Sequence, residues 1–264
     1  MSVEQPRSPT SIGTSDPTTI TLLGQDLAAD LMGTISFGEL AFQLTAQRRP
    51  TAGQLRVFEA VLVALDDHGF TPTAIASRLT LLSAPESIQG AMAAGLLGGG
   101  SRFLGVTEDT ARFLADTLAD NDTPETREDW NDLARKAIRQ RRERDQLVPG
   151  LGHPVHKIED PRTPVLIRIA LESGTHGPHL ALFEAIGAVA PDELGRRLPL
   201  NGAGVCGAAL ADLGLPVELL RGYALLARAA GLLGHLAEEM RNPVAHDIYL
   251  SVDRNAEYVD PTQS

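Results

Sequence analysis

The sequence predicts an all-α protein, because helix signals recur along it while strand signals are weak. The clearest apolar stripe at helical spacing consists of Leu55, Phe58, Leu62 and Leu65. This helix is expected to stop at Gly69. The β-branched runs are short, and aromatic residues make up only 4% of the chain. No stretch alternates strands with helices, which argues against a doubly wound α/β fold.

Three further helices are indicated by their ends and their length. Thr123 is expected as an N-cap with Pro124 at the first helical position, since both residue types suit the unpaired amides of a helix start. The same Thr-Pro pair opens residues 163–174, which end in glycine. Residues 216–240 would span about 37 Å as one continuous helix.

The segments between helices are predicted from their composition. Residues 1–19 are polar, are rich in Ser, Thr and Pro, and lack the apolar core of a signal peptide, so we expect a disordered tail. Linkers are expected at residues 106–110 and 119–126, and over residues 145–164. The last of these holds four prolines and two glycines, which exclude a continuous helix, together with two histidines. Loops that carry function have this composition.

Charge and cysteine content exclude several classes of protein. With 23 basic and 34 acidic residues the formal charge is −11, so we expect no nucleic-acid partner. No stretch is long enough without charge to span a membrane. The single cysteine, Cys206, allows no disulfide within the chain, which suits a reducing compartment and a cytoplasmic location. A buried apolar role is the main interpretation of Cys206, and a catalytic thiol is the alternative.

Three glycines have the spacing of a dinucleotide-binding turn. Gly202, Gly204 and Gly207 match G-x-G-x-x-G. Pro199, however, is a poor residue for the strand that should precede them, and no acidic residue about 20 positions on closes a second strand. The glycines are better explained as small residues that let a helix approach a neighbour or a ligand closely.

A histidine-containing loop carries a resemblance to a known family. His153 lies between Gly152 and Pro154, and the local sequence alone fits a ligand-binding loop and a surface turn equally well. The segment resembles the citrate synthase family pattern G-[FYI]-G-H-x-V-x-K-x-x-D-P-R, through Gly150, Gly152, His153, Val155, Lys157, Asp160, Pro161 and Arg162. Residues 36–69, 91–105 and 213–239 also resemble the family's segments, in the right order.

The resemblance implies a fold and an assembly. The short chain is most similar to the citryl-CoA lyase branch, which includes the C-terminal module of ATP-citrate lyase. The family fold would be all-α, with a large helical domain made from residues 20–106 and 216–264 and a small helical domain over residues 107–215. A homodimer with sites near its interface is expected. Closure of the small domain would exclude water from the reaction.

The resemblance also implies site residues. His68 matches the family's substrate-contacting histidine, and His153 matches its catalytic histidine, which bonds the carbonyl or hydroxyl oxygen at the reacting carbon. Arg162 and Arg228 match its carboxylate-binding arginines. Arg241 is the candidate for a last arginine that the partner subunit contributes. The expected coenzyme A contacts are Val148, Pro149, Gly150, Leu151, Gly152 and Lys157.

The late helix offers one more candidate acid–base group. His235 follows Arg228 by seven residues, hence on the same helix face. A core histidine bonded to backbone is the alternative for His235. Arg228 lies among Leu, Ala and Gly, so either an acidic side chain or a ligand must pair with it. His176 and His179 are further candidates for a proton donor. No metal is expected, since the histidines lack a spacing such as H-x-x-x-H.

Two positions depart from the family pattern. Ala203 stands where the catalytic aspartate is expected, and Phe103 stands where citrate synthases carry a histidine. The resemblance implies a citryl-CoA lyase-like enzyme that cleaves or forms the carbon–carbon bond between acetyl-CoA and a 2-oxo acid such as oxaloacetate. Its partners would be small molecules, with the coenzyme A thioester as substrate and no permanently bound cofactor. Because alanine moves no proton, action on a different acyl-CoA and a non-catalytic binding role stay open.

Overall fold

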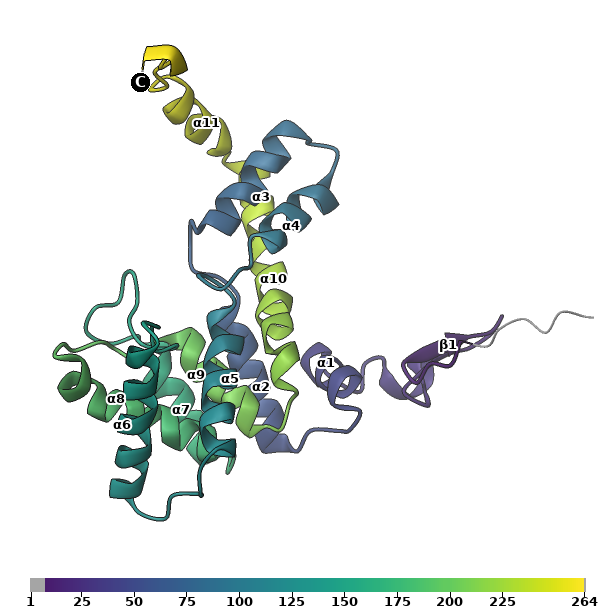
Figure 1. The fold of residues 1–264 in the computed structure, drawn as a ribbon. Helices are drawn as coiled ribbons and strands as arrows, with labels where there is room; N and C mark the ends of the chain where they lie inside the picture. Colours follow the sequence, from purple (N-terminus) through teal and green to yellow (C-terminus); the bar gives the residue numbers. More distant parts are fainter. Residues whose placement is uncertain (1–7, 264) are drawn as a thin grey trace, which may run out of the picture.

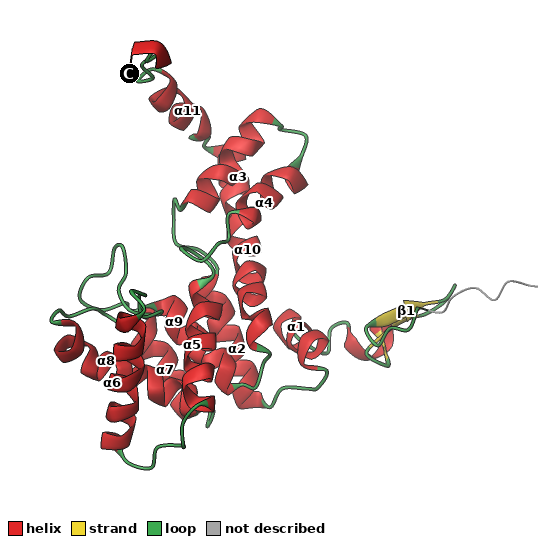
Figure 2. Cartoon of the chain, viewed as in Figure 1, coloured by secondary structure: helices red, strands yellow, loops and turns green. Residues whose placement is uncertain are grey.

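The computed structural model describes residues 8–263, and helices dominate it (Figure 2). The helices are α1 (Phe37–Ala46), α2 (Ala52–Leu65), α3 (Pro72–Ser83), α4 (Ile88–Leu97), α5 (Val106–Ala119), α6 (Arg127–Glu143), α7 (Arg162–Glu172), α8 (Pro178–Leu194), α9 (Gly202–Asp212), α10 (Leu220–Arg241) and α11 (Ala245–Asp253). Short turns of helix cover Leu27–Leu31, Val217–Leu219 and Pro261–Gln263. The all-α class is confirmed, and within residues 8–263 no helix is long and apolar enough to cross a membrane.

Helix α10 runs between the two ends of the molecule (Figure 1). At one end it packs with α3 and α4 around a small core of Leu81, Ala91 and Leu236. At the other end α2 and α5–α9 share the main core with the first half of α10. Helix α11 and the N-terminal hairpin project from this body (Figure 1). The division into a large and a small domain stays a prediction.

Helix α9 lies inside the main core, in contact with α2, α5, α7 and α8. A Cβ atom on Gly207 would lie 2.1 Å from the carbonyl oxygen of Thr107 on α5. One on Gly204 would lie 2.7 Å from the Cα of Gly150. The glycines are therefore packing positions within a helix, as the sequence indicated, and not a phosphate-binding turn after a strand.

Two predicted helix starts are wrong. Helix α6 begins after Thr126 rather than Thr123, because Thr126 and Asp129 cap each other's backbone amides. Helix α7 begins at Arg162, and the hydroxyl of Thr163 instead donates to the carbonyl oxygen of Leu200, 3.1 Å away. The predicted end of α7 is confirmed, since Gly174 follows it with a φ of +66°.

The irregular segments partly follow the prediction. Strand β1 (Gly13–Ser15) pairs with β2 (Ile20–Leu22), which pairs with β3 (Gln25–Asp26), all antiparallel. The predicted tail is thus ordered as a strand at residues 13–15, while residues 1–7 lie outside the described residues. The linker predicted at 106–110 is wrong, because these residues begin α5. Residues 120–126 and 145–161 lie outside α-helices, as expected.

Candidate active site

A cavity of about 1220 Å³ brings most of the predicted site residues together, but not Lys157, His235 or Arg241. Its wall includes His68 from the α2–α3 loop, His153 from the loop before α7, and the guanidinium groups of Arg162 and Arg228. Residues 148–152, the predicted coenzyme A loop, also line it. Segments more than 150 positions apart in the sequence therefore meet at one site.

The loop that carries His153 is tied to the start of α9. Gly150 and Gly152 have φ values of +82° and +81°, a region that favours glycine. The amide of Gly152 donates to the carbonyl oxygen of Pro199 at 2.8 Å, and the amide of Asn201 donates to that of Gly150 at 2.9 Å. The side-chain amide of Asn201 donates to the carbonyl oxygen of Gly152 at 2.8 Å. These bonds hold the loop against the main core.

Local hydrogen bonds determine which ring nitrogen of His153 carries the proton. Its Nδ1 accepts from the amides of Val155, at 3.1 Å, and His156, at 3.0 Å. An accepting Nδ1 leaves the proton of the neutral ring on Nε2. Burial lowers the pKa of His153, so the ring is neutral at pH 7 and offers Nε2–H as a donor. Lys157 is exposed and bonds the carbonyl oxygen of His153, outside the cavity lining.

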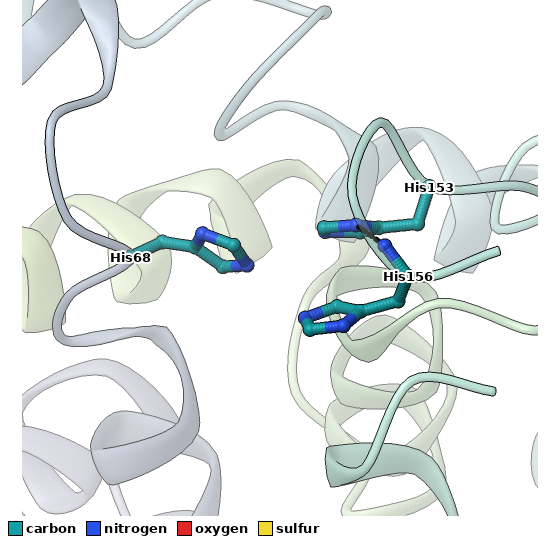
Figure 3. Close-up of side chains that lie close together, drawn as sticks. All are labelled: His68, His153 and His156. Atoms are coloured by element: carbon teal, nitrogen blue, oxygen red, sulfur yellow. Dashed lines mark hydrogen bonds between the residues drawn. The ribbon is translucent and has the colours of Figure 1, made fainter.

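Three imidazoles gather at this end of the cavity, where His68 points toward the stacked pair His153 and His156 (Figure 3). The ring centroid of His68 lies 5.1 Å from that of His153 and 5.6 Å from that of His156. One nitrogen from each ring lies within 4.8 Å of the others. This cluster has no H-x-x-x-H spacing in the sequence, so the sequence did not predict it. A metal on Nε2 of His153 would force the proton onto Nδ1 and break both amide bonds. The cluster therefore fits a ligand that accepts a hydrogen bond better than it fits a metal.

Arg162 is held by a carboxylate that the sequence motif already contained. Its Nε and Nη2 donate to Asp160 at 3.0 and 2.7 Å, and its Nη1 donates to the carbonyl oxygen of Ala64 at 3.1 Å. Although burial opposes ionisation, hydrogen bonds from Arg162 and from the amide of Gly202 hold the pKa of Asp160 far below its usual range. A guanidinium has five N–H groups, and these three bonds leave two for a ligand.

Arg228 has both an acidic partner and an unused donor. Its side chain is 5% exposed, and Nη1 lies 3.2 Å from Oδ1 of Asp67. Its buried Nε has no hydrogen-bond partner among residues 8–263. A buried donor without a partner is costly unless a ligand supplies an acceptor. Asp67, which sequence reasoning missed, directly precedes His68 in an Asp-Asp-His run.

Other predicted acid–base residues do not reach the cavity. His235 lies behind its wall, with Nε2 2.9 Å from Oδ1 of Asp67, so the predicted catalytic role is corrected. His176 and His179 pair instead with Glu184 and Asp212, at 2.6 and 2.9 Å.

Arg241 also lies outside the cavity lining. It is exposed at the end of α10, about 20 Å along the helix from Arg228. Because its expected role is in the site of a partner subunit, that role stays a prediction.

Ala203 and Phe103 both line the cavity. The acidic lining residues are Asp109, Asp116 and Asp120, on or just after α5. Among the described residues, no carboxylate lines the cavity from the elements that carry His153, Ala203 and Arg228. The reacting end of the cavity therefore offers imidazoles and guanidinium groups, but no carboxylate base.

The cavity is positively charged although the chain is acidic. Among the described residues, three acidic and seven basic side chains line it. The basic residues are Arg102, Arg112, Lys136, Arg141, Arg144, Arg162 and Arg228. The whole chain has a formal charge of −11. This concentration of basic groups suits a polyanionic ligand.

Comparisons with known proteins identify the family of the chain that forms this cavity. The family model for the citrate synthase C-terminal domain matches residues 22–248. The 2-methylcitrate synthase 1 of Corynebacterium glutamicum is 28% identical over 73% of this chain and 48% of its own length. The citrate synthase of Deinococcus radiodurans is 27% identical over 90% of this chain and 61% of its own. The chain thus spans about half the length of these curated relatives.

Solved structures agree with the family model. The citryl-CoA lyase of Hydrogenobacter thermophilus superposes with a TM-score of 0.83 at 28% identity, covering 96% of this chain and 94% of that one. The ATP citrate lyase of Methanothrix soehngenii, in complex with citrate and coenzyme A, shares the fold with a TM-score of 0.77 at 19% identity, over 98% of this chain and 43% of that one. The chain belongs to the citrate synthase family.

Proposed function

We propose that the protein is a citryl-CoA lyase-like enzyme that cleaves or forms the carbon–carbon bond between acetyl-CoA and a 2-oxo acid such as oxaloacetate. The observation that carries this proposal is the shared cavity of His153, Arg162 and Arg228. The similarity to citryl-CoA lyase over nearly the whole chain supports it.

The two arginines would hold the carboxylates of the organic acid. Each has N–H groups left over for a ligand, and a guanidinium binds carboxylates strongly. The Nε2–H of His153 would donate to the oxygen on the reacting carbon. This bond would stabilise the negative charge that the oxygen carries as the carbon–carbon bond breaks or forms.

Proton transfer is expected to be the slow step of the proposed reaction, because no side chain is assigned to it. Cleavage removes the proton of the tertiary hydroxyl and adds one to the methyl carbon of acetyl-CoA. Ala203 can do neither, so we assign these transfers to water in the cavity. A well-placed acid–base group contributes about 10²–10⁴-fold in rate, and the enzyme should be slow by that factor.

The coenzyme A thioester would bind as a substrate, with no permanently bound cofactor. Its phosphates would face the basic side chains from α5 and α6, and its adenine would meet the backbone of residues 148–152. We extend the proposal to a homodimer in the cytoplasm. Small molecules would be its ligands.

Ala203 favours one alternative within the same fold. A small side chain in a cavity that the apolar Phe103 also lines would leave room for an acyl group larger than acetyl. The similarity to a 2-methylcitrate synthase is compatible with this. A non-catalytic role in binding coenzyme A and an organic acid is the other alternative, since the family's catalytic aspartate is absent.

Acetyl-CoA release from citryl-CoA separates these possibilities. The wild-type protein should release acetyl-CoA, and His153→Ala should be slower by about 100-fold or more, with coenzyme A affinity unchanged. Equal rates would remove His153 from the mechanism. Binding of citrate and coenzyme A without turnover of citryl-CoA would favour the binding role, and turnover of a longer acyl-CoA alone would favour the other substrate.

A further inference from the structure

A chain of polar contacts, buried at Arg78, His235 and Arg228 and exposed at Asp67, leads from α3 to the wall of the cavity. It runs from Arg78 through His235 and Asp67 to Arg228. We propose that Arg78 and His235 position Asp67, and that Asp67 holds Arg228 in the orientation that binds a carboxylate of the organic acid. The inference rests on the proposed function, and it makes His235 a positioning residue rather than a catalytic one.

The first link determines which nitrogen of His235 carries its proton. The side chain of Arg78 is fully buried, and its Nε and Nη2 lie 3.1 and 2.8 Å from Nδ1 of His235. A guanidinium only donates hydrogen bonds, so Nδ1 is an acceptor and Nε2 carries the proton. Glu238 and Glu239 neutralise Arg78 from its other side, which accounts for the burial of this charge.

The second link orients Asp67. Nε2 of His235 lies 2.9 Å from Oδ1, and the amide of Gly69 donates to Oδ2 at 2.8 Å. Both carboxylate oxygens are therefore held. Although burial opposes ionisation, the hydrogen bonds from Gly69 and His235 lower the pKa of Asp67, so the group is an anion at pH 7.

The third link reaches the cavity. Oδ1 of Asp67 accepts from Nη1 of Arg228 at 3.2 Å, while the buried Nε of Arg228 has no hydrogen-bond partner in the described part of the chain. Holding one end of the guanidinium reduces the conformational entropy that carboxylate binding would otherwise cost. Asp67 also directly precedes His68, another residue of the cavity wall.

Phe70 packs against the Arg78 and His235 side chains of this chain. Its ring lies over Arg78, with the guanidinium carbon 4.8 Å from the ring centroid, and its centroid lies 5.8 Å from that of His235. Phe70 itself lines the cavity, while Arg78 and His235 do not. The polar route from His235 to the cavity therefore runs through Asp67, since Phe70 offers His235 only a ring contact.

Calorimetric titration of citrate and of coenzyme A, separately, tests the inference. His235→Gln keeps one amide N–H for Asp67 and one carbonyl oxygen for Arg78, so citrate affinity should stay within about 3-fold of wild type. His235→Met fills similar space without either bond, and citrate affinity should fall by about 10- to 100-fold. Coenzyme A affinity should not change in either variant.

A matched control is His176→Met, which removes another histidine–carboxylate pair, with Glu184, outside the cavity. It should bind citrate as the wild type does. Thermal melting and coenzyme A affinity report folding. Should His235→Met not fold, His235→Asn, too short to reach both partners, replaces it with the same expected loss.

The outcomes separate this inference from the proposed function. Wild-type citrate affinity in the Met or Asn variant would overturn the positioning role, as would an equal loss in His235→Gln. Arg228→Met tests the carboxylate contact directly. If Arg228→Met also binds citrate normally, or if the wild type does not bind it, the proposed function fails together with the inference. If Arg228→Met loses affinity and His235→Met does not, only the positioning role fails.

Discussion

Replacing Gly207 by alanine tests why α9 carries glycines at this spacing. The added Cβ would lie 2.1 Å from the carbonyl oxygen of Thr107, a backbone atom of α5 that moves only if the helix moves. Overpacking of this kind costs about 1–3 kcal/mol, and a rigid neighbour puts Gly207 at the upper end. The better helix propensity of alanine offsets about 1 kcal/mol. The variant should therefore be destabilised by about 2 kcal/mol.

The control is Gly234→Ala, also inside a helix. Apart from its chain neighbours and the backbone of its own helix, no atom of the described residues lies within 4 Å of the Cβ position at Gly234, so only the propensity gain of at most about 1 kcal/mol remains. By thermal melting, Gly207→Ala should lower Tm by about 4–8 °C, while Gly234→Ala should raise it by about 2–4 °C at most. A Gly207→Ala protein as stable as the wild type would refute the packing explanation.

Three further predictions concern chemistry at named groups. Ala203→Asp should raise acetyl-CoA release from citryl-CoA by about 10²–10⁴-fold, because it supplies a carboxylate at the reacting end of the cavity; an unchanged rate in a folded variant would contradict the assignment of that position. Burial lowers the pKa of His153 from its ordinary 6.5, so in the folded protein the ring is mostly neutral at pH 6.5 and becomes protonated at lower pH. The contribution of His153 to stability is therefore present above pH 6.5 and is lost as the pH falls through the lowered pKa of the folded protein. Activity measured against pH should fall in that same lower range, not above pH 6.5. Cys206 is fully buried, and burial raises the pKa of its thiol to about 12, so a thiol reagent at pH 8 should react with it only after denaturation; rapid reaction of the native protein would contradict this burial.

Helix positions were predictable where the signal is local. The apolar stripe of α2 and the glycine after α7 depend only on neighbouring residues. The start of α5 was not predictable from local signals, because residues 106–110 have a loop-like composition. Glu108 and Asp109 suit the first turn of a helix, and Thr107 and Thr110 are buried against the core, which local composition does not reveal.

The site was predictable where a contiguous motif carries it. The segment from Gly150 to Arg162 contains His153 and both members of the Asp160–Arg162 pair. His235 was misassigned because helical spacing puts it on the face of Arg228 without showing what lies opposite that face. Arg78, on another helix, occupies that place.

By itself, the sequence determined the helical class and the small residues of α9, because each is encoded by neighbours in the chain. The contiguous family motif in the histidine loop determined His153 and Arg162 through its resemblance. Only the tertiary structure decided that His68 meets His153 and His156, that Asp67 links Arg228 to His235, and that seven basic groups surround one cavity of an acidic chain. These arrangements join residues tens to more than a hundred positions apart. Hydrogen bonds and charge pairs depend on distance in space, which spacing along the chain does not fix beyond one helix or turn.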